Sequence, residues 1–160
     1  MTEDREKNYV DHSQPLSEAC PIGSALDVLG QKWTLLIIRE AVKGARRFSE
    51  FEQALGCPRN LLSARLRLLR DRGILRVVPY EIPGQRVREH YELTPAGREL
   101  APTLITLFDW GMKHTSAEGA SWTEPRLRCS CGAKIHAALE CDGGHHITAV
   151  DELTFPEALS

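Results

Sequence analysis

A chain of 160 residues, 42% hydrophobic and with a formal net charge of −2, is long enough for one domain with a small appendage and can bury a core. It has no run of about 18 apolar residues, and its polar N-terminus lacks an apolar signal stretch, so neither a membrane span nor secretion is expected. Five cysteines, an odd number, fit the reducing cytoplasm better than a disulfide framework.

In chain order, residues 1–18 are polar and are expected to form a flexible tail. Cys20 and Pro21 then precede a short helix that ends near Gly30 and whose apolar face carries Ala25, Leu26 and Leu29. A second helix ends near Gly44, and its apolar face carries Trp33, Leu36, Ile37 and Ala41. Both helices are expected to pack against the segment that follows.

Residues 47–75 predict a helix, a tight turn and a second helix. Ser49 and Glu52 have the spacing of a capping box at a helix start. The turn contains glycine and proline at positions 56 and 58, and Gly73 is placed as a C-terminal stop. Between the two breaks, the second helix carries an inner face of three leucines at helical spacing, Leu62, Leu66 and Leu69.

The opposite face of this second helix is small, polar and arginine-bearing, as a major-groove reading helix requires. Residues 39–98 carry 13 Lys and Arg against seven Asp and Glu, a net of +6, whereas the rest of the chain carries −8. All but one of these cations are arginine, whose guanidinium suits phosphates and base edges. An amphipathic hairpin with a solvated basic face is the alternative. The candidate DNA-contacting residues here are Ser49, Arg59, Asn60, Ser63, Ala64 and Arg67.

A β-hairpin is expected next. Val77 and Val78 favour one strand, a Pro-Gly pair at positions 83 and 84 marks the turn, and a second strand runs through Tyr91 and Leu93. Arg86 and Arg88 lie at or near the tip, where a wing beside a reading helix would contact phosphates or a minor groove. A plain solvated hairpin is the alternative.

Thr94 and Pro95 predict the start of a C-terminal helix. This helix is apolar over an arc too wide for burial in a small domain alone, so a homodimer contact is expected. The candidate dimerisation residues are Leu100, Leu104, Leu107, Phe108 and Trp110.

The segment from residue 117 to residue 160 is expected to form a small β-rich extension. It contains enough ligand atoms for a tetrahedral zinc site, at Cys129, Cys131, Cys141 and His145. The first pair is spaced more tightly than usual, however, and Gly144 stands where the second pair would need a cysteine. The pattern is compatible with a degenerate zinc ribbon without metal or with an altered Zn²⁺ site, and it favours the former.

Three segments together resemble the HxlR-type family of winged helix-turn-helix transcriptional regulators: CPIGSALDVLGQKWTLLIIREAVKGARRFSEF, NLLSARLRLLRDRGIL and YELTPAGRELAPTLITLFDWG. The resemblance implies a homodimeric, double-stranded-DNA-binding bacterial regulator whose terminal helices form the dimer interface. Some members sense oxidants through a cysteine in the Cys-Pro pair before the first helix, and Cys20 matches that position. Its placement near a helix N-terminus would favour the thiolate.

The expected fold is mainly α (α+β): a winged helix-turn-helix over residues 19–116 with a two-stranded β wing, a C-terminal dimerisation helix and a small β-rich appendage. The expected function is sequence-specific DNA binding, with a winged-helix protein-interaction module as the alternative. No nucleophile elbow, phosphate loop or HExxH motif is present, so an enzyme is not expected. No cofactor is required by this interpretation, and nothing in the sequence identifies a small-molecule effector.

Overall fold

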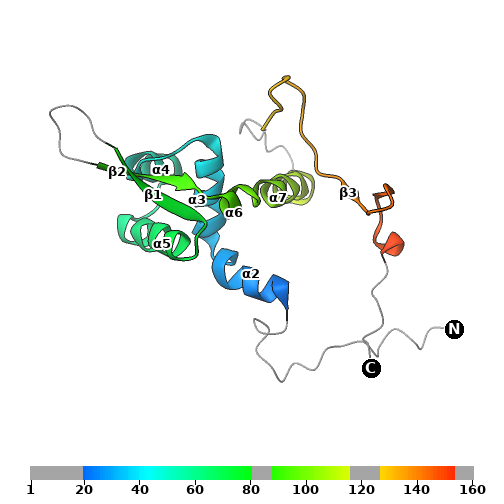
Figure 1. Ribbon diagram of the computed structural model, residues 1–160, viewed down its shortest axis with the longest axis horizontal. Coiled ribbons are helices and arrows are strands. Elements are labelled where there is room, and N and C mark those ends of the chain that lie inside the picture. The colour runs from blue at the N-terminus through cyan, green and yellow to red at the C-terminus, as the bar shows by residue number, and fades with distance from the viewer. Residues whose placement is uncertain (1–19, 81–87, 116–126, 154–160) are drawn as a thin grey trace. The chain divides into compact units, whose positions relative to one another are not determined.

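The computed structural model describes residues 20–80, 88–115 and 127–153 (Figure 1). The chain divides into two compact units, the first ending at Ala101 and the second beginning at Pro102. The predicted N-terminal tail and the predicted tip of the wing, with Arg86, lie outside the described residues. None of the helices in the described ranges is both long enough and apolar enough to cross a bilayer.

The first unit is a winged helix-turn-helix, which confirms the predicted fold class. Helix α3 is its central element, because it contacts α2, α4, α5 and the second strand of the sheet (Figure 1). The elements in order are α2 (Pro21–Leu29), α3 (Lys32–Lys43), α4 (Phe48–Leu55), α5 (Arg59–Asp71), β1 (Leu75–Tyr80), β2 (Arg88–Leu93) and α6 (Pro95–Arg98).

The core of this unit lies between α3, α4, α5 and the start of β1. The three leucines predicted to form the inner face of α5 are fully buried, and Phe51 of α4 is buried with them. On α3 the buried apolar residues are Ile37 and Ile38, whereas Trp33 is only partly buried, with the Lys32 ammonium 5.2 Å from its ring centroid. The spacing of leucines thus predicted the core better than the position of the largest aromatic residue did.

Helix α4 begins earlier than predicted. Its N-cap is Arg47, and the Glu50 carboxylate accepts hydrogen bonds from the backbone N–H groups of Arg46 and Arg47 at 2.7 and 3.0 Å. These two bonds lower the pKa of Glu50. The predicted capping box of Ser49 and Glu52 is therefore wrong, since Ser49 lies inside the helix.

Helix α5 ends as predicted. Gly73 has a φ of +68°, which a glycine adopts without steric penalty. Its N–H donates to the Arg70 carbonyl, and the N–H of Ile74 donates to the Leu69 carbonyl. This is a Schellman motif, and it turns the chain directly into β1.

The wing strands pair antiparallel, with Leu75 opposite Leu93 and Tyr80 opposite Arg88. The sheet is attached to the helices at Tyr91, whose N–H donates to the Arg46 carbonyl at 2.7 Å. The Tyr91 ring also meets Phe51 edge-on, at a centroid distance of 6.2 Å. The base of the wing is therefore held against the start of α4.

The predicted single C-terminal helix is two helices. Thr94 caps α6 as expected, accepting a hydrogen bond from the Gly97 N–H at 3.1 Å, but α6 ends at Arg98. Helix α7 runs from Ala101 to His114, so Leu100 lies between the helices. Pro102 explains the break, because proline lacks an N–H and is tolerated only in the first turn of a helix.

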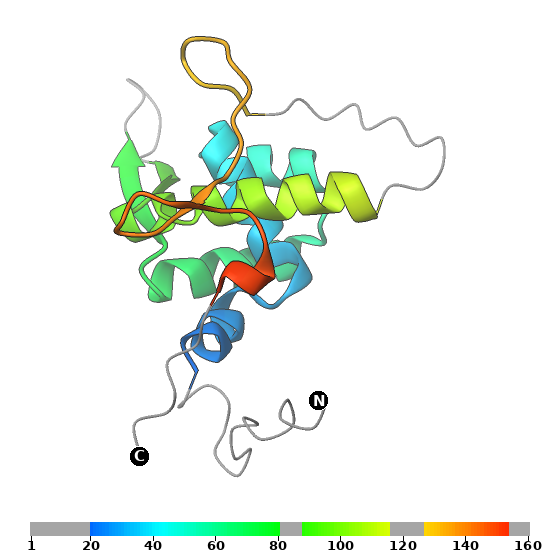
Figure 2. The same ribbon diagram turned by 90° about the vertical axis from the view of Figure 1, so that its right-hand side faces the viewer.

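The second unit contains α7 and a sparsely packed tail (Figure 2). The tail has two short strands, β3 (Leu139–Glu140) and β4 (His146–Ile147), which pair antiparallel, followed by the 3₁₀ turn η1 (Val150–Glu152). No side chain described between residues 127 and 153 is buried. The tail is therefore held by hydrogen-bonded turns rather than by a hydrophobic core.

Candidate nucleic-acid interface

The predicted reading face of α5 is exposed. Leu62, Leu66 and Leu69 anchor one side of the helix in the core. Because residues on a helix repeat about every 3.6 positions, the side opposite these leucines points to solvent. The exposed residues of that side include four predicted DNA contacts, Asn60, Ser63, Ala64 and Arg67.

The two arginines predicted on this helix differ in their surroundings. Arg67 makes no hydrogen bond or ion pair with any residue in the described ranges, so its guanidinium is available to a ligand. Arg59 donates to both carboxylate oxygens of Glu52, at 3.0 and 2.9 Å, and lies 5.2 Å from the centroid of the Phe48 ring. Arg59 thus links the two helices of the motif and would have to exchange a carboxylate for a phosphate to contact DNA.

The wing is present, but only its base is described. Arg88 occupies the first position of β2, and its side chain lies outside what the structure describes, as does the whole of Arg86. At the base, Glu92 accepts from Arg76 at 2.6 Å, is joined to His90 at 3.1 Å and lies 3.5 Å from Arg46. Its pKa falls to about 2, mainly because Arg76 donates to the carboxylate and His90 adds a second hydrogen bond.

Sequence reasoning missed Arg47. The Arg47 guanidinium lies at the start of α4, 5.3 Å from the centroid of the Tyr80 ring at the end of β1. This contact places a cation between the helix-turn-helix and the wing. Ser49, a predicted DNA contact, is exposed nearby on the first turn of α4. The signal available in the sequence was the arginine pair immediately before the helix.

The predicted dimerisation surface is partly uncovered. On α7 the exposed fractions of Leu107 and Trp110 are 48% and 56%, whereas Leu104 and Phe108 are partly buried. Helix α2 contributes exposed apolar side chains too, because Ile22 and Leu26 are 71% and 57% exposed. The apolar face of this helix was predicted to pack against the following segment; that expectation is wrong for Ala25 and Leu26, which are exposed, whereas Leu29 is partly buried.

The cysteines fall into three environments. Cys20 is the N-cap of α2 and is partly exposed. Cys57, in the turn of the helix pair, is buried, and this burial raises the pKa of its thiol, so it is a packing residue. The tail cysteines are all exposed.

The candidate zinc ligands are brought together as two pairs. The Cys141 sulfur lies 3.6 Å from Nδ1 of His145, and backbone N–H groups of His145 and Gly143 lower the pKa of the Cys141 thiol. The thiol pKa of Cys129 is lowered by hydrogen bonds from Cys131. Among the described residues, however, no three or more such side chains are close enough together to hold a metal ion.

Comparison with known proteins supports the architecture. The model of the HxlR-like helix-turn-helix family matches residues 28–119. An uncharacterised HTH-type transcriptional regulator of Mycobacterium tuberculosis is 40% identical over 131 residues, covering 72% of this chain and 80% of that protein. An uncharacterised HTH-type regulator of Bacillus subtilis, YdeP, is 31% identical over 106 residues, covering 66% and 81%.

Solved structures of similar proteins also support the winged helix-turn-helix fold. PA1607, named as a candidate transcription factor, superposes with a TM-score of 0.77 at 32% identity, covering 91% of this chain and all of that one. The redox regulator HypR in its oxidised form gives a TM-score of 0.55 at 29% identity, covering 61% of this chain and 100% of that one. These neighbours are regulators of transcription or redox response rather than enzymes.

Proposed function

Because the chain belongs to the HxlR-like helix-turn-helix family, and is a transcriptional regulator rather than an enzyme, we propose that it binds a specific operator as a homodimer. In this proposal α5 enters the major groove, and the wing formed by β1 and β2 contacts phosphates or the minor groove. The observation that carries the proposal is the exposed face of α5, which is backed by buried leucines and carries the unpaired Arg67.

The chemistry of that face fits direct reading of bases. Arginine reads guanine through two parallel hydrogen bonds, and asparagine reads adenine in the same way. Ser63 and Ala64 are small, so they let the helix backbone approach the groove closely. Arg67 and Asn60 are therefore the expected base contacts, whereas Arg86 and Arg88 are the expected backbone contacts.

Two copies are required by the geometry of such sites, because dimers of this class address half-sites about one helical turn, or roughly 34 Å, apart. The exposed apolar side chains of α7, Leu107 and Trp110, support this assembly. Burying them between two copies would remove apolar surface that a single chain leaves in water.

The proposal is tested by fluorescence anisotropy with the DNA immediately upstream of this protein's own gene, titrated at several salt concentrations. Binding should weaken steeply with salt, since each phosphate neutralised releases condensed counterions. Random DNA of equal length should bind at least about a thousandfold more weakly. A protein-interaction module, the alternative, would show neither the salt slope nor the preference.

Two variants distinguish a residue that contacts bases from one that contacts the DNA backbone. Arg67→Ala should lose about 1–3 kcal/mol on the operator and little on random DNA, so preference relaxes. Arg86→Ala should weaken binding to both DNAs alike and make the salt slope shallower by about one. Lys134→Ala, which removes one exposed cation from the tail, is the matched control and should change neither. An Arg67→Ala protein with unchanged operator preference would refute the reading role of α5.

A further inference from the structure

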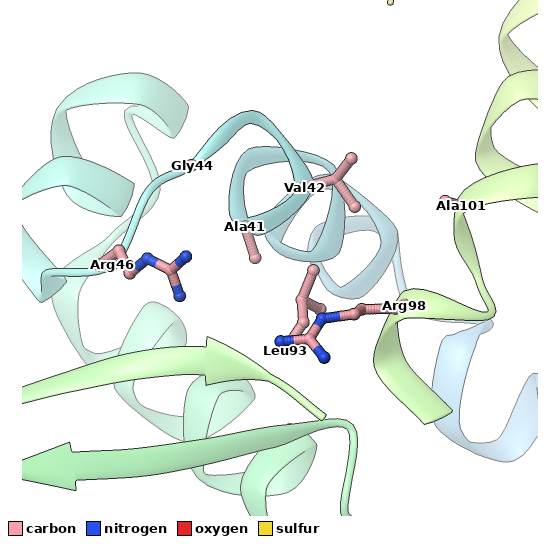
Figure 3. Close-up of a pocket in the computed structure, with 7 residues that line it drawn as sticks. All are labelled: Ala41, Val42, Gly44, Arg46, Leu93, Arg98 and Ala101. Atoms are coloured by element: carbon pink, nitrogen blue, oxygen red, sulfur yellow. The ribbon is translucent and has the colours of Figure 1, made fainter. Parts of the chain in front are cut away.

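A cavity of about 280 Å³ lies in the first unit (Figure 3). None of the described residues that line it belongs to helix α5. Its wall combines apolar and cationic groups. Figure 3 shows the guanidinium groups of Arg46 and Arg98 pointing into the cavity toward each other. The apolar part of the wall is formed by Ala41, Val42 and Leu93.

The charges in this cavity are unbalanced. None of the described residues that line it is acidic. Arg98 makes no hydrogen bond or ion pair through its side chain with any residue in the described ranges. Arg46 forms an ion pair with Glu92 at 3.5 Å, and that carboxylate is held more closely by Arg76 at 2.6 Å and by His90 at 3.1 Å. Arg98 therefore has no anionic partner among the described residues, and Arg46 shares its partner Glu92 with two other basic side chains.

The backbones that carry these arginines are fixed. The Arg46 carbonyl accepts from Tyr91 at 2.7 Å, and the Arg46 N–H donates to Glu50 at 2.7 Å. Arg98 follows Gly97, whose position is so close to the Ile74 carbonyl that an added Cβ would lie 2.3 Å from that oxygen. Packing thus fixes the backbone positions from which the two guanidinium groups reach the cavity, so a ligand need not pay to order the backbone there.

We propose that this cavity binds a small organic carboxylate, with the carboxylate between Arg46 and Arg98 and its apolar body against Ala41, Val42 and Leu93. Guanidinium groups match a carboxylate through paired hydrogen bonds. The apolar wall selects against inorganic anions, which have no hydrophobic part to bury. A volume of 280 Å³ is just below the usual range of about 300–1,000 Å³ for ligand pockets, so a ligand no larger than a single ring or short chain is expected.

The position of the site suggests what the ligand would do. Arg46 precedes α4 of the reading motif, whereas Arg98 and Ala101 lie where the chain passes from α6 into α7. A carboxylate held by both arginines would link these two parts of the first unit and relieve the repulsion between the cations. The site is separate from the proposed DNA contacts, so its existence does not depend on them.

The test is isothermal titration calorimetry of the full chain with benzoate and hexanoate as carboxylate probes. Benzamide is the neutral analogue of benzoate, and sulfate is an anion without an apolar body. We expect at least one carboxylate to bind at least about tenfold more tightly than benzamide and sulfate, a difference of about 1.4 kcal/mol. Failure of both carboxylates to bind, or equal binding of benzamide or sulfate, would overturn the proposal.

Variants locate the site. Arg98→Gln and Arg46→Gln should each weaken carboxylate binding at least about tenfold, whereas Arg98→Lys, which keeps the charge but loses the planar fork, should have an intermediate effect. The matched control is Arg72→Gln, which removes an exposed arginine that does not line the cavity and should bind as the wild type does. Circular dichroism melts verify that each variant is folded. An equal loss in Arg72→Gln and Arg98→Gln would contradict the assignment.

Measuring DNA binding as well distinguishes failure of the carboxylate-site proposal from failure of the operator-binding proposal. Without ligand, Arg98→Gln should bind the operator as the wild type does, because Arg98 is not among the proposed DNA contacts. A chain that binds DNA but no carboxylate overturns only this inference. A chain that binds a carboxylate but no DNA leaves the inference standing and refutes the operator-binding proposal.

Discussion

Glu92, at the base of the wing, interacts with three basic side chains. Its carboxylate meets Arg76, His90 and Arg46, and its pKa is lowered from 4.5 to about 2. A carboxyl group whose pKa is lower in the folded state stabilises that state at pH values above its unfolded pKa. This stabilisation is lost as the pH falls from about 4.5 towards 2.

Replacing Glu92 should therefore have a pH-dependent effect. Glu92→Gln is expected to lower the midpoint of thermal unfolding by a few degrees at pH 7, since the pairs it makes are partly exposed and each is modest. The difference from wild type should shrink as the pH is lowered from 4.5 to 2.5. Melts followed by circular dichroism at three pH values measure it, with exposed Glu99→Gln as the control. An effect of equal size at every pH would contradict the role assigned to the ionised carboxylate.

Cys20 is the second residue with a testable role. It occupies the N-cap of α2 and is partly accessible. The structural neighbours include the redox regulator HypR and the reduced form of YodB, a transcriptional regulator of Bacillus subtilis. Redox sensing at Cys20 is thus a proposal drawn from its position and from these neighbours.

Oxidation should alter operator binding by the wild type but not by Cys20→Ser. Gel shifts with and without hypochlorite measure the difference, and dithiothreitol should restore the reduced behaviour if the product is a disulfide. Cys141→Ser is the matched control, because it removes an exposed thiol from the tail. Loss of the response in Cys141→Ser rather than in Cys20→Ser would show that the sensing thiol lies in the tail and would contradict the role proposed for Cys20.

At the scale of elements, the helix pair could be predicted and its exact boundaries could not. The leucines of α5 and the stop at Gly73 are local signals, and both are confirmed. The start of α4 was predicted two residues late because Ser49 with Glu52 and Arg47 with Glu50 offer the same spacing. In the structure the helix starts at the second pair, where the Glu50 carboxylate accepts from the N–H groups of Arg46 and Arg47.

The tail is the element whose chemistry is least constrained by packing. Each of its two turns closes in the same way: Cys129 N–H donates to the Ala133 carbonyl, and Cys141 N–H donates to the His145 carbonyl. Each turn also contains a glycine with positive φ, Gly132 at +87° and Gly144 at +79°. The two turns are therefore closed by the same pattern of backbone hydrogen bonds.

Our prediction for the tail remains a degenerate ribbon without metal. Native mass spectrometry of the purified chain after addition of Zn²⁺ should give the mass of the protein alone, and EDTA should leave thermal unfolding unchanged. The control is Cys141→Ser, which should behave identically. One bound zinc that is lost in Cys141→Ser would instead establish an altered site formed by both cysteine-containing turns.

At the scale of the whole molecule, the apolar surface of the two terminal helices calls for a partner. Ile22 and Leu26 on α2 and Leu107 and Trp110 on α7 are all more than two-fifths exposed in a single chain. Scattered exposed hydrophobic residues are ordinary, but each of these helices by itself carries two of them about one turn apart, which favours an interaction surface on each helix. We propose a second copy of this chain as the partner, because operators of helix-turn-helix dimers contain two half-sites.

Substituting that surface should separate the copies. Trp110→Arg is expected to shift the protein from dimer to monomer in size-exclusion chromatography with light scattering, since a buried charge without a partner is costly. Operator affinity should fall with it, whereas weak binding to random DNA should persist. Leu139→Arg is the matched control, because Leu139 is 63% exposed on the tail hairpin. A Trp110→Arg protein that remains dimeric would place the interface elsewhere.

The class of fold, the helix pair and the family could all be predicted from the sequence, because they depend on periodic leucines, turn residues and arginine content that act locally. Which arginines have an acidic partner among the described residues depends on tertiary packing. Arg59 and Arg67 are alike in sequence, but packing of α4 against α5 brings Glu52 to the first, whereas the second has no carboxylate partner in the part of the chain that the structure describes. Tertiary structure likewise placed Arg46 and Arg98 at one cavity, since these residues are 52 positions apart and only the packing of α3, β2 and α6 brings them together. Electrostatic pairing between distant positions depends on separations of a few ångströms, and no local pattern contains that information.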